Sequence, residues 1–430
     1  MDHYGFTPAQ EMFLRHGRTG RAEGVLDVTT WFAGHIDRGP GAEAMSRAVC
    51  ALLRRHEVLR LRLARDGDAL VQHFESGPDD EIVRWCDGGA GALRAIDIDR
   101  TGPLAVLIEP DHEGRGALAH VGLHHLAYDG WSLATIKREL SALYAACVAG
   151  TDPADPPPVS YASLLPRTTG PSGLDEARLG YWKSQLRGAR PWRLPRRGVP
   201  ASTGLAVRPI PGQGVGDFAS AARRLGEPPS VLLIGAAVLA CAAVTGDDEV
   251  TLSHLYGGRG PSTPPVVGPL GLRQIYLRQG VPRDEDLGTF LRRLHTGWLG
   301  GILRSEPPYS APRLFRMLDQ GNDFAYLGDS TCVGGGEVVV NVSGSVGHHR
   351  RGATDEITWF GGGGAMATHS AAPLLIDADL GAFEESLRVH WRTDVHAAAD
   401  VERYLTALTQ VVAMLQHAES VTPVAALVSS

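Results

Sequence analysis

Two adjacent histidines, a carboxylate four residues after the second, and a glycine occur together in HHLAYDGWS, residues 124–132. These residue types can bind a metal, form a buried structural network or move a proton during group transfer. On an extended chain, His124 and His125 point to opposite faces, and a His–Asp pair has fewer ligands than zinc takes. Metal binding is therefore disfavoured, whereas a buried network and group transfer both stay open.

Gly130 and the helix expected after it favour group transfer. Without a Cβ, Gly130 lets a substrate thioester or a backbone come close. The helix that begins near Ser132 brings its first amide groups to the same place, where they favour developing negative charge. His125, with an ordinary pKa near neutrality, is suited to taking a proton from an attacking amine or alcohol.

A hairpin before this segment and a helix after it are the elements expected to position it. The runs 104–110 and 117–125 are short, contain β-branched and alternating residues and have a turn between them, which predicts two antiparallel strands. Residues 132–150 place apolar side chains on one helical stripe and end at a glycine, which predicts a helix.

The rest of the chain mixes helices and strands without a regular βαβ rhythm, which indicates an α/β or α+β fold. At 430 residues the chain is long enough for two domains, and a proline-rich connection at 151–161 favours a boundary near 175. The expected lobes are 1–175 and 176–430. Apolar patterns predict helices over 41–60, 228–246 and 400–415 and strands over 248–256 and 336–344.

Composition narrows the class of protein. The chain is 43% hydrophobic and 21% charged with a net charge of −7, which gives no reason to expect nucleic acid as a partner. The sequence has neither an apolar run of membrane-spanning length nor a secretory signal, so we expect a cytoplasmic protein. Five scattered cysteines form no CxxC pair, and the abundance of arginine, alanine and glycine is typical of a bacterial gene.

Several segments match the motifs of one family. HHLAYDG has the form HHxxxDG, RHEVLRLRL (55–63) has the form RHExLR, and YWKSQL (181–186) carries a tryptophan at the expected place. TPAQEMF (7–13), VVGPLG (266–271) and VVVNVSG (338–344) follow in the same order. The chain therefore resembles the condensation domains of nonribosomal peptide synthetases, which have the chloramphenicol acetyltransferase-like fold.

The resemblance implies a fold and a set of site residues. Two chloramphenicol acetyltransferase-like lobes would form a V-shaped pseudo-dimer with His125 at the junction, and the second lobe would carry floor and crossover segments. His125 and Gly130 would be catalytic, with His125 acting as a general base or positioning the nucleophile. The supporting residues would be His124, Asp129 and Arg55, with Asp129 held by Arg55; Arg60 and Trp182 would maintain structural integrity; Trp131, Ser132 and Asn341 would line the substrate channel.

The resemblance also implies a reaction. An acyl or aminoacyl group would pass from a carrier-protein phosphopantetheine thioester to an amine, forming an amide in natural-product biosynthesis without a bound cofactor or metal. No adenylation segment or carrier-type serine motif occurs, so a free-standing enzyme with its carrier in trans is expected, and the arginines of 187–197 are candidates for docking it. The acceptor is a carrier-bound amino acid or a free small molecule. Two alternatives stay open: an ester-forming O-acyltransferase and a catalytically silent carrier-docking module.

Overall fold

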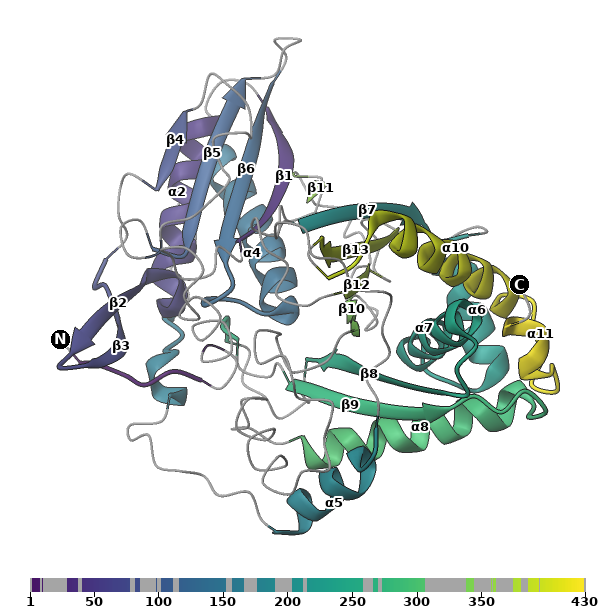
Figure 1. The fold of residues 1–430 in the computed structure, drawn as a ribbon. Coiled ribbons are helices and arrows are strands. Elements are labelled where there is room, and N and C mark those ends of the chain that lie inside the picture. The colour runs from purple at the N-terminus through teal and green to yellow at the C-terminus, as the bar shows by residue number, and fades with distance from the viewer. Residues whose placement is uncertain are drawn as a thin grey trace. The chain divides into compact units, whose positions relative to one another are not determined.

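The computed structural model of the protein is drawn in Figure 1. It describes residues 2–7, 10, 29–37, 41–77, 82–85, 98, 102–110, 116–151, 157–165, 176–189, 203–211, 215–257, 266–269, 273–305, 338–343, 357, 359–360, 374–379, 386–393 and 395–428. Of the arginine-rich segment 187–197, residues 190–197 lie outside the described residues.

Two compact units make up the chain, and the division expected at residue 175 needs a correction. The units consist of Met1–Pro171, Gly257–Leu272 and Arg350–Thr368, and of Ser172–Tyr256, Arg273–His349 and His369–Ser430. The lobes are therefore not the contiguous ranges 1–175 and 176–430.

Long-range contacts explain this division. Phe360 pairs with Ala33 in the sheet of the first unit. The amide of Gly268 donates a hydrogen bond to the hydroxyl of Ser132 over 2.9 Å. Sequence-local patterns carry no signal for either contact.

The first unit is built on a five-stranded sheet in the order β11-β1-β6-β5-β4. Neighbouring strands are antiparallel except β4 and β5, which are parallel. Helices α2 and α4 pack against each other, and β2 and β3 form a separate antiparallel hairpin. The elements are β1 (Thr29–Asp37), α2 (Gly41–Arg55), the 3-10 helix η1 (Glu57–Arg60), β2 (Leu61–Asp66), β3 (Ala69–Phe74), β4 (Val83–Trp85), β5 (Leu104–Pro110), β6 (Gly116–His124), α4 (Gly130–Val148), the 3-10 helix η3 (Ala162–Leu164) and β11 (Trp359–Phe360).

The second unit is built on a six-stranded mixed sheet in the order β7-β13-β12-β10-β8-β9. Strand β10 is parallel to β12 and to β8, and the other neighbours are antiparallel. The elements are α5 (Glu176–Leu186), β7 (Thr203–Pro209), α6 (Val215–Leu225), α7 (Pro229–Thr245), β8 (Glu249–Tyr256), β9 (Arg273–Gly280), α8 (Leu287–Arg304), β10 (Val338–Ser343), β12 (Leu374–Asp379), β13 (Ser386–Arg392), α10 (Ala398–Leu415) and α11 (Val424–Val428).

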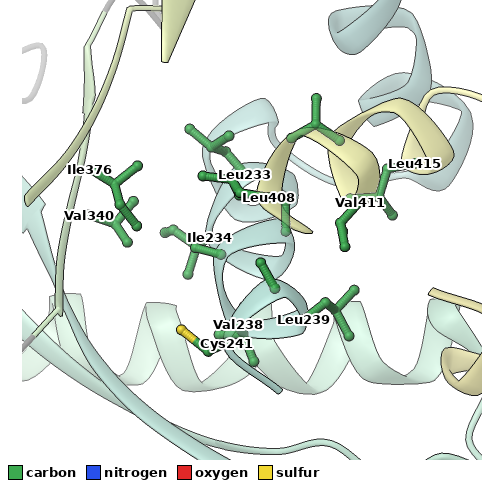
Figure 2. Close-up of a cluster of buried hydrophobic side chains, with 14 of the residues drawn as sticks. Leu233, Ile234, Val238, Leu239, Cys241, Val340, Ile376, Leu408, Val411 and Leu415 are labelled. Carbon is green, nitrogen blue, oxygen red and sulfur yellow. The ribbon is translucent and has the colours of Figure 1, made fainter. Parts of the chain in front are cut away.

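Helix α7 is the centre of the second unit's core. Ser230–Ala242 is buried without interruption, as expected for an apolar run too long for a strand. Figure 2 shows Leu233, Ile234, Val238 and Leu239 of this helix in the same apolar cluster as residues of α10 and the sheet. The helix predicted over 228–246 is therefore confirmed.

One predicted helix is shorter in the structure. A single helix was expected over 41–60, but α2 ends at Arg55 and η1 begins at Glu57. His56 between them is extended (φ −109°, ψ 100°), and the Arg55 carbonyl accepts a hydrogen bond from the amide of Val159 over 2.7 Å. This contact across the chain takes up a carbonyl near the end of α2.

Among the described residues, no single helix is both long and apolar enough to span a membrane. One pair, Asp217–Leu225 with Pro229–Thr245, meets the length and composition test together and is bent by 93°.

Candidate active site

The HHxxxDG segment forms the turn that joins β6 to α4. His124 is the last residue of β6, and Gly130 is the first residue of α4. The amide of His124 donates to the carbonyl of Pro103 over 2.8 Å, while Nδ1 of His124 accepts from the amide of Leu126 over 3.2 Å. His124 is buried, and this position fits the structural role expected for it.

His125 is the second residue of this turn, and its side chain is half-buried. The ring stacks on Tyr128 with 4.3 Å between centroids and 18° between planes. Burial, followed by the neighbouring His124, lowers the pKa of His125 to about 3, although a hydrogen bond with the Tyr128 backbone raises it. The imidazole is therefore neutral at pH 7.

Asp129 caps the helix that follows. Its Oδ1 accepts from the amide of Ser132 over 2.9 Å and from the hydroxyl of Ser132 over 2.7 Å. A side-chain oxygen that satisfies a first-turn amide is the usual way to start a helix. The cap uses the Ser132 amide, so that amide is not aimed at a substrate.

The expected pairing of Asp129 with Arg55 is wrong. Nε of Arg55 lies 2.9 Å from Oε2 of Glu139, and Nε2 of His56 lies 2.7 Å from the same oxygen. Burial raises the pKa of Glu139, but the His56 hydrogen bond and the charges of His56 and Arg55 outweigh it, so the pKa is lowered. Arg55 and Glu139 hold α2 to α4, a contact that depends on helix packing rather than on the motif.

Ser132 was expected to line a substrate channel, and the structure corrects this as well. Ser132 is 1% exposed, and its hydroxyl also contacts the backbone of Gly268, at 3.1 Å from the carbonyl and 2.9 Å from the amide. Gly268 has a φ of +147°, and a Cβ built there would lie 2.2 Å from the ring of Tyr161. Only glycine fits this position, and Ser132 fixes the loop that contains it.

Gly130 and Trp131 lie on the more open side of the turn. Gly130 is exposed, and a Cβ built on it would have no heavy atom within 4 Å among the described residues. Packing among the described residues therefore does not require glycine here. Trp131 is half-buried, and its Nε1 would lie 3.0 Å from a Cβ built on Gly257.

Asn341 belongs to the second unit. It lies on β10, is half-buried, and its Nδ2 donates to Oδ1 of Asp377 over 3.0 Å. Asn341 and Asp377 are register partners in the parallel pair β10–β12. A role of Asn341 toward the substrate stays a prediction.

Arg60 and Trp182 occupy positions that suit the integrity role. Nε of Arg60 donates to the carbonyl of Leu53 over 2.9 Å, and a second guanidinium nitrogen donates to the carbonyl of Glu75. Trp182 is 2% exposed and donates from its indole nitrogen to the carbonyl of Arg304 over 3.3 Å.

Two glutamines next to the turn had no role in the sequence-based site. Gln10 and Gln72 are both fully buried, and Gln10 hydrogen-bonds to the carbonyl of Leu126. Gln10 stands in a recognised motif, but the contact joins residues 116 positions apart, so no local pattern identifies its partner.

Among the described residues, no three His, Cys, Asp or Glu side chains are grouped as a metal site. Among the described residues, Cys50, Cys147 and Cys241 form no disulfide bond.

Solved structures with this fold are condensation domains and related proteins. The SgcC5 protein of Streptomyces globisporus superposes with a TM-score of 0.75 at 17% identity, over 97% of this chain and 99% of that one. The condensation domain of the Monacolin K polyketide synthase MokA gives a TM-score of 0.75 at 16% identity, over 99% of each chain. The first condensation domain of the calcium-dependent antibiotic synthetase gives 0.75 at 17%, over 99% and 98%.

Curated relatives are large synthetases. Phosphinothricin tripeptide synthetase PhsC of Streptomyces viridochromogenes is 32% identical over 47% of this chain and 21% of its own length. Enniatin synthase of Fusarium equiseti is 31% identical over 37% of this chain and 6% of its own length. The matched regions thus span about a fifth or less of these relatives, and no family model matches the chain.

The protein therefore has the condensation-domain fold, with two units of mixed strands and helices as expected for the chloramphenicol acetyltransferase-like class. Its curated relatives over part of its length include nonribosomal peptide synthetases.

Proposed function

We propose that the protein transfers an acyl or aminoacyl group from a phosphopantetheine thioester on a carrier protein to an amine, forming an amide in natural-product biosynthesis. The carrier acts in trans, and no metal or bound cofactor takes part. The observation that carries this proposal is the half-buried, neutral imidazole of His125 on a turn that also holds the exposed Gly130, where a Cβ would meet no described heavy atom within 4 Å.

The lowered pKa of His125 favours a role in positioning the nucleophile over a role as general base. A general base works best with a pKa near the working pH, whereas the pKa of His125 is lowered to about 3. The neutral ring can still accept a hydrogen bond from an attacking N–H and orient its lone pair. Of the two roles left open for His125, positioning is therefore the one the electrostatics favour.

Positioning of the nucleophile by His125 is sufficient help when the acyl donor is a thioester. Its carbonyl is already activated, so orientation of the two reactants can supply much of the rate. The first turn of α4 presents the positive end of the helix dipole near Gly130, which favours the oxyanion of a tetrahedral intermediate.

Ester formation is the second candidate. The SgcC5 structure is a complex with (R)-(−)-1-(2-naphthyl)-1,2-ethanediol and sucrose, and a diol offers hydroxyl groups as nucleophiles. A neutral His125 could orient a hydroxyl as readily as an amine, so the acceptor must be identified by experiment.

A silent docking module is the third candidate. The X-domain of teicoplanin biosynthesis superposes with a TM-score of 0.72 at 15% identity in its complex with OxyB, over 99% of this chain and 96% of that one. A chain of this type would bind its partner and leave the thioester unchanged.

Intact-protein mass spectrometry of acyl-loaded carrier proteins, mixed with the enzyme and candidate amines or alcohols, tests the proposal. We expect acceptor-dependent loss of the acyl group from the carrier and a new amide. His125→Ala should lower this turnover about 10²-fold, because the nucleophile loses the group that orients it, while leaving the melting temperature nearly unchanged.

Three other results would decide against parts of the proposal. A new ester in place of an amide favours the second candidate, and binding without turnover favours the third. Transfer from a coenzyme A ester but from no carrier contradicts the role of the carrier protein.

A further inference from the structure

A buried hydrogen-bond network connects the N-terminal segment to the turn that carries His125. Nε2 of Gln10 donates to the carbonyl of Leu126, the residue after His125, over 2.9 Å. The amide of Leu126 donates to the ring of His124. Both backbone polar groups of Leu126 are thus hydrogen-bonded, the amide to His124 of the motif and the carbonyl to Gln10.

Gln10 uses its whole amide group in this network. Nε2 also donates to Oε1 of Gln72 over 3.0 Å, and Oε1 of Gln10 accepts from Nε2 of Gln72 over 3.0 Å and from the amide of Thr7 over 2.9 Å. A primary amide has two donor hydrogens and two acceptor lone pairs. All four are used here, and a fully satisfied buried network is rigid.

The network is anchored in the hairpin β2–β3. Gln72 lies on β3, and its backbone forms two hydrogen bonds with Tyr4, of 2.8 and 3.0 Å. Nε2 of Gln72 also donates to the carbonyl of Gly5 over 2.7 Å. A regular element therefore fixes the segment that supports the His125 turn.

The same segment contacts the loop of Gly268. The hydroxyl of Thr7 accepts a hydrogen bond from the amide of Gln10 over 3.2 Å and donates one to the carbonyl of Pro269 over 3.3 Å. Ser132, at the other end of the HHxxxDG turn, bonds Gly268. The two ends of the turn are thus linked to one loop, at one end through Thr7 and Gln10.

We propose that Gln10 is a positioning residue of the acyl-transfer site, which sets the His125 turn through the carbonyl of Leu126. This inference rests on the proposed function. Gln10 touches no reacting atom in this role. It acts through Leu126, whose peptide is adjacent to His125, and through the loop of Gly268.

Gln10→Ala is the principal variant, and Gln416→Ala is its matched control. Gln416 is also buried, at 6% exposure, and its Nε2 donates to the carbonyl of Pro211 over 2.6 Å. It belongs to the second unit. Both variants remove a buried amide donor from a backbone carbonyl, so both should lower the melting temperature.

Only Gln10→Ala should change the site. We expect kcat for acyl transfer from a loaded carrier protein to fall about 10- to 100-fold, because a displacement near 1 Å can cost about 10²-fold. In ¹⁵N-histidine NMR spectra, the His125 ring signals, assigned as those missing in His125→Ala, should shift and titrate at a higher pH than in wild type. Gln416→Ala should retain wild-type kcat and wild-type His125 signals.

The proposal is overturned if Gln10→Ala lowers the melting temperature like Gln416→Ala but leaves kcat and the His125 signals unchanged. If Gln10→Ala does not fold, Gln10→Met, which keeps the side-chain volume, is measured in the same two ways. Failure of both to fold would make Gln10 a folding residue and overturn the proposal. Wild-type protein that transfers no acyl group contradicts the proposed function, whereas the NMR measurement still tests the link from Gln10 to His125.

Discussion

Two helices, one in each unit, begin with the same side-chain arrangement. Asp129 caps α4 by accepting from the amide and hydroxyl of Ser132 over 2.9 and 2.7 Å. Asp286 caps α8 by accepting from the amide and hydroxyl of Thr289 over 2.8 and 2.9 Å. Asp129 is 3% exposed, whereas Asp286 lies on the surface.

The two hydroxyl groups have different further partners. That of Ser132 reaches the backbone of Gly268, 136 residues later in the chain. That of Thr289 accepts a hydrogen bond from exposed Arg292, three residues later. The pattern Asp-x-x-Ser/Thr starts a helix in both places, but it joins distant segments only in the first. What a local motif does beyond its local role depends on what packs against it.

The largest expected effect is a loss of unfolding free energy in acid, caused by His125 in the turn before the first cap. Because the pKa of His125 is lowered to about 3 in the folded state, the unfolded chain binds more protons between pH 6.5 and about 3. The contribution of His125 to the free energy of unfolding is therefore complete above pH 6.5 and is lost as the pH falls through this window. Discounted for the half-exposed ring, the loss is on the order of a few kcal/mol.

Urea unfolding at pH 7, 6, 5 and 4.5 measures this effect. His254 and His390 of the second unit, whose pKa values burial lowers to about 4, add losses of the same sign. His125→Ala should therefore flatten the pH dependence of the unfolding free energy without abolishing it. Identical pH dependence in wild type and variant would contradict the neutral, buried environment assigned to His125.

Removing each cap tests the comparison directly. Asp129→Ala should destabilise the protein by about 2 kcal/mol, near the upper end for an N-cap, because it also leaves a buried hydroxyl without its closest partner. Asp286→Ala should cost only about 0.5–1 kcal/mol. Thermal and urea unfolding at pH 7 compare the two, and equal losses would show that burial of the first cap adds nothing.

Truncating the hydroxyl partner should have a smaller effect. Ser132→Ala keeps the backbone bond to Asp129 but loses the side-chain bonds to Asp129 and Gly268, so we expect a loss of about 1–2 kcal/mol. Thr289→Ala, at the exposed cap, should stay within about 0.5 kcal/mol of wild type. Hydrogen exchange at Gly268 should accelerate only in Ser132→Ala, and unchanged protection there would mean that other contacts hold the loop.

The smallest expected effect on stability is that of Gly130→Ala. The added Cβ meets no described heavy atom within 4 Å, and alanine is favoured over glycine in a helix by up to about 1 kcal/mol. The melting temperature should stay constant or rise slightly while acyl transfer falls, because the methyl group would occupy space near the approaching thioester. Full activity in this variant would remove Gly130 from the catalytic residues.

Local patterns predicted most of the fold near the site. The hairpin of 104–110 and 117–125 and the helix of 132–150 correspond to β5, β6 and α4, within two residues at each end. Periodicity and turn residues are sufficient there because these elements are continuous in sequence. The helix predicted over 41–60 was too long, because the carbonyl of Arg55 accepts its hydrogen bond from the amide of Val159.

The sequence by itself determined the elements and the order of the HHxxxDG residues, because short-range periodicity, caps and a family motif are written along the chain. Tertiary structure alone decided that Arg55 pairs with Glu139, that Ser132 is buried against Gly268 and that Gln10 holds Leu126. Each of these contacts joins residues 84 or more positions apart, as the residue numbers show. Hydrogen-bonding groups that are buried together must satisfy one another, and which groups are buried together depends on how the helices and sheets pack.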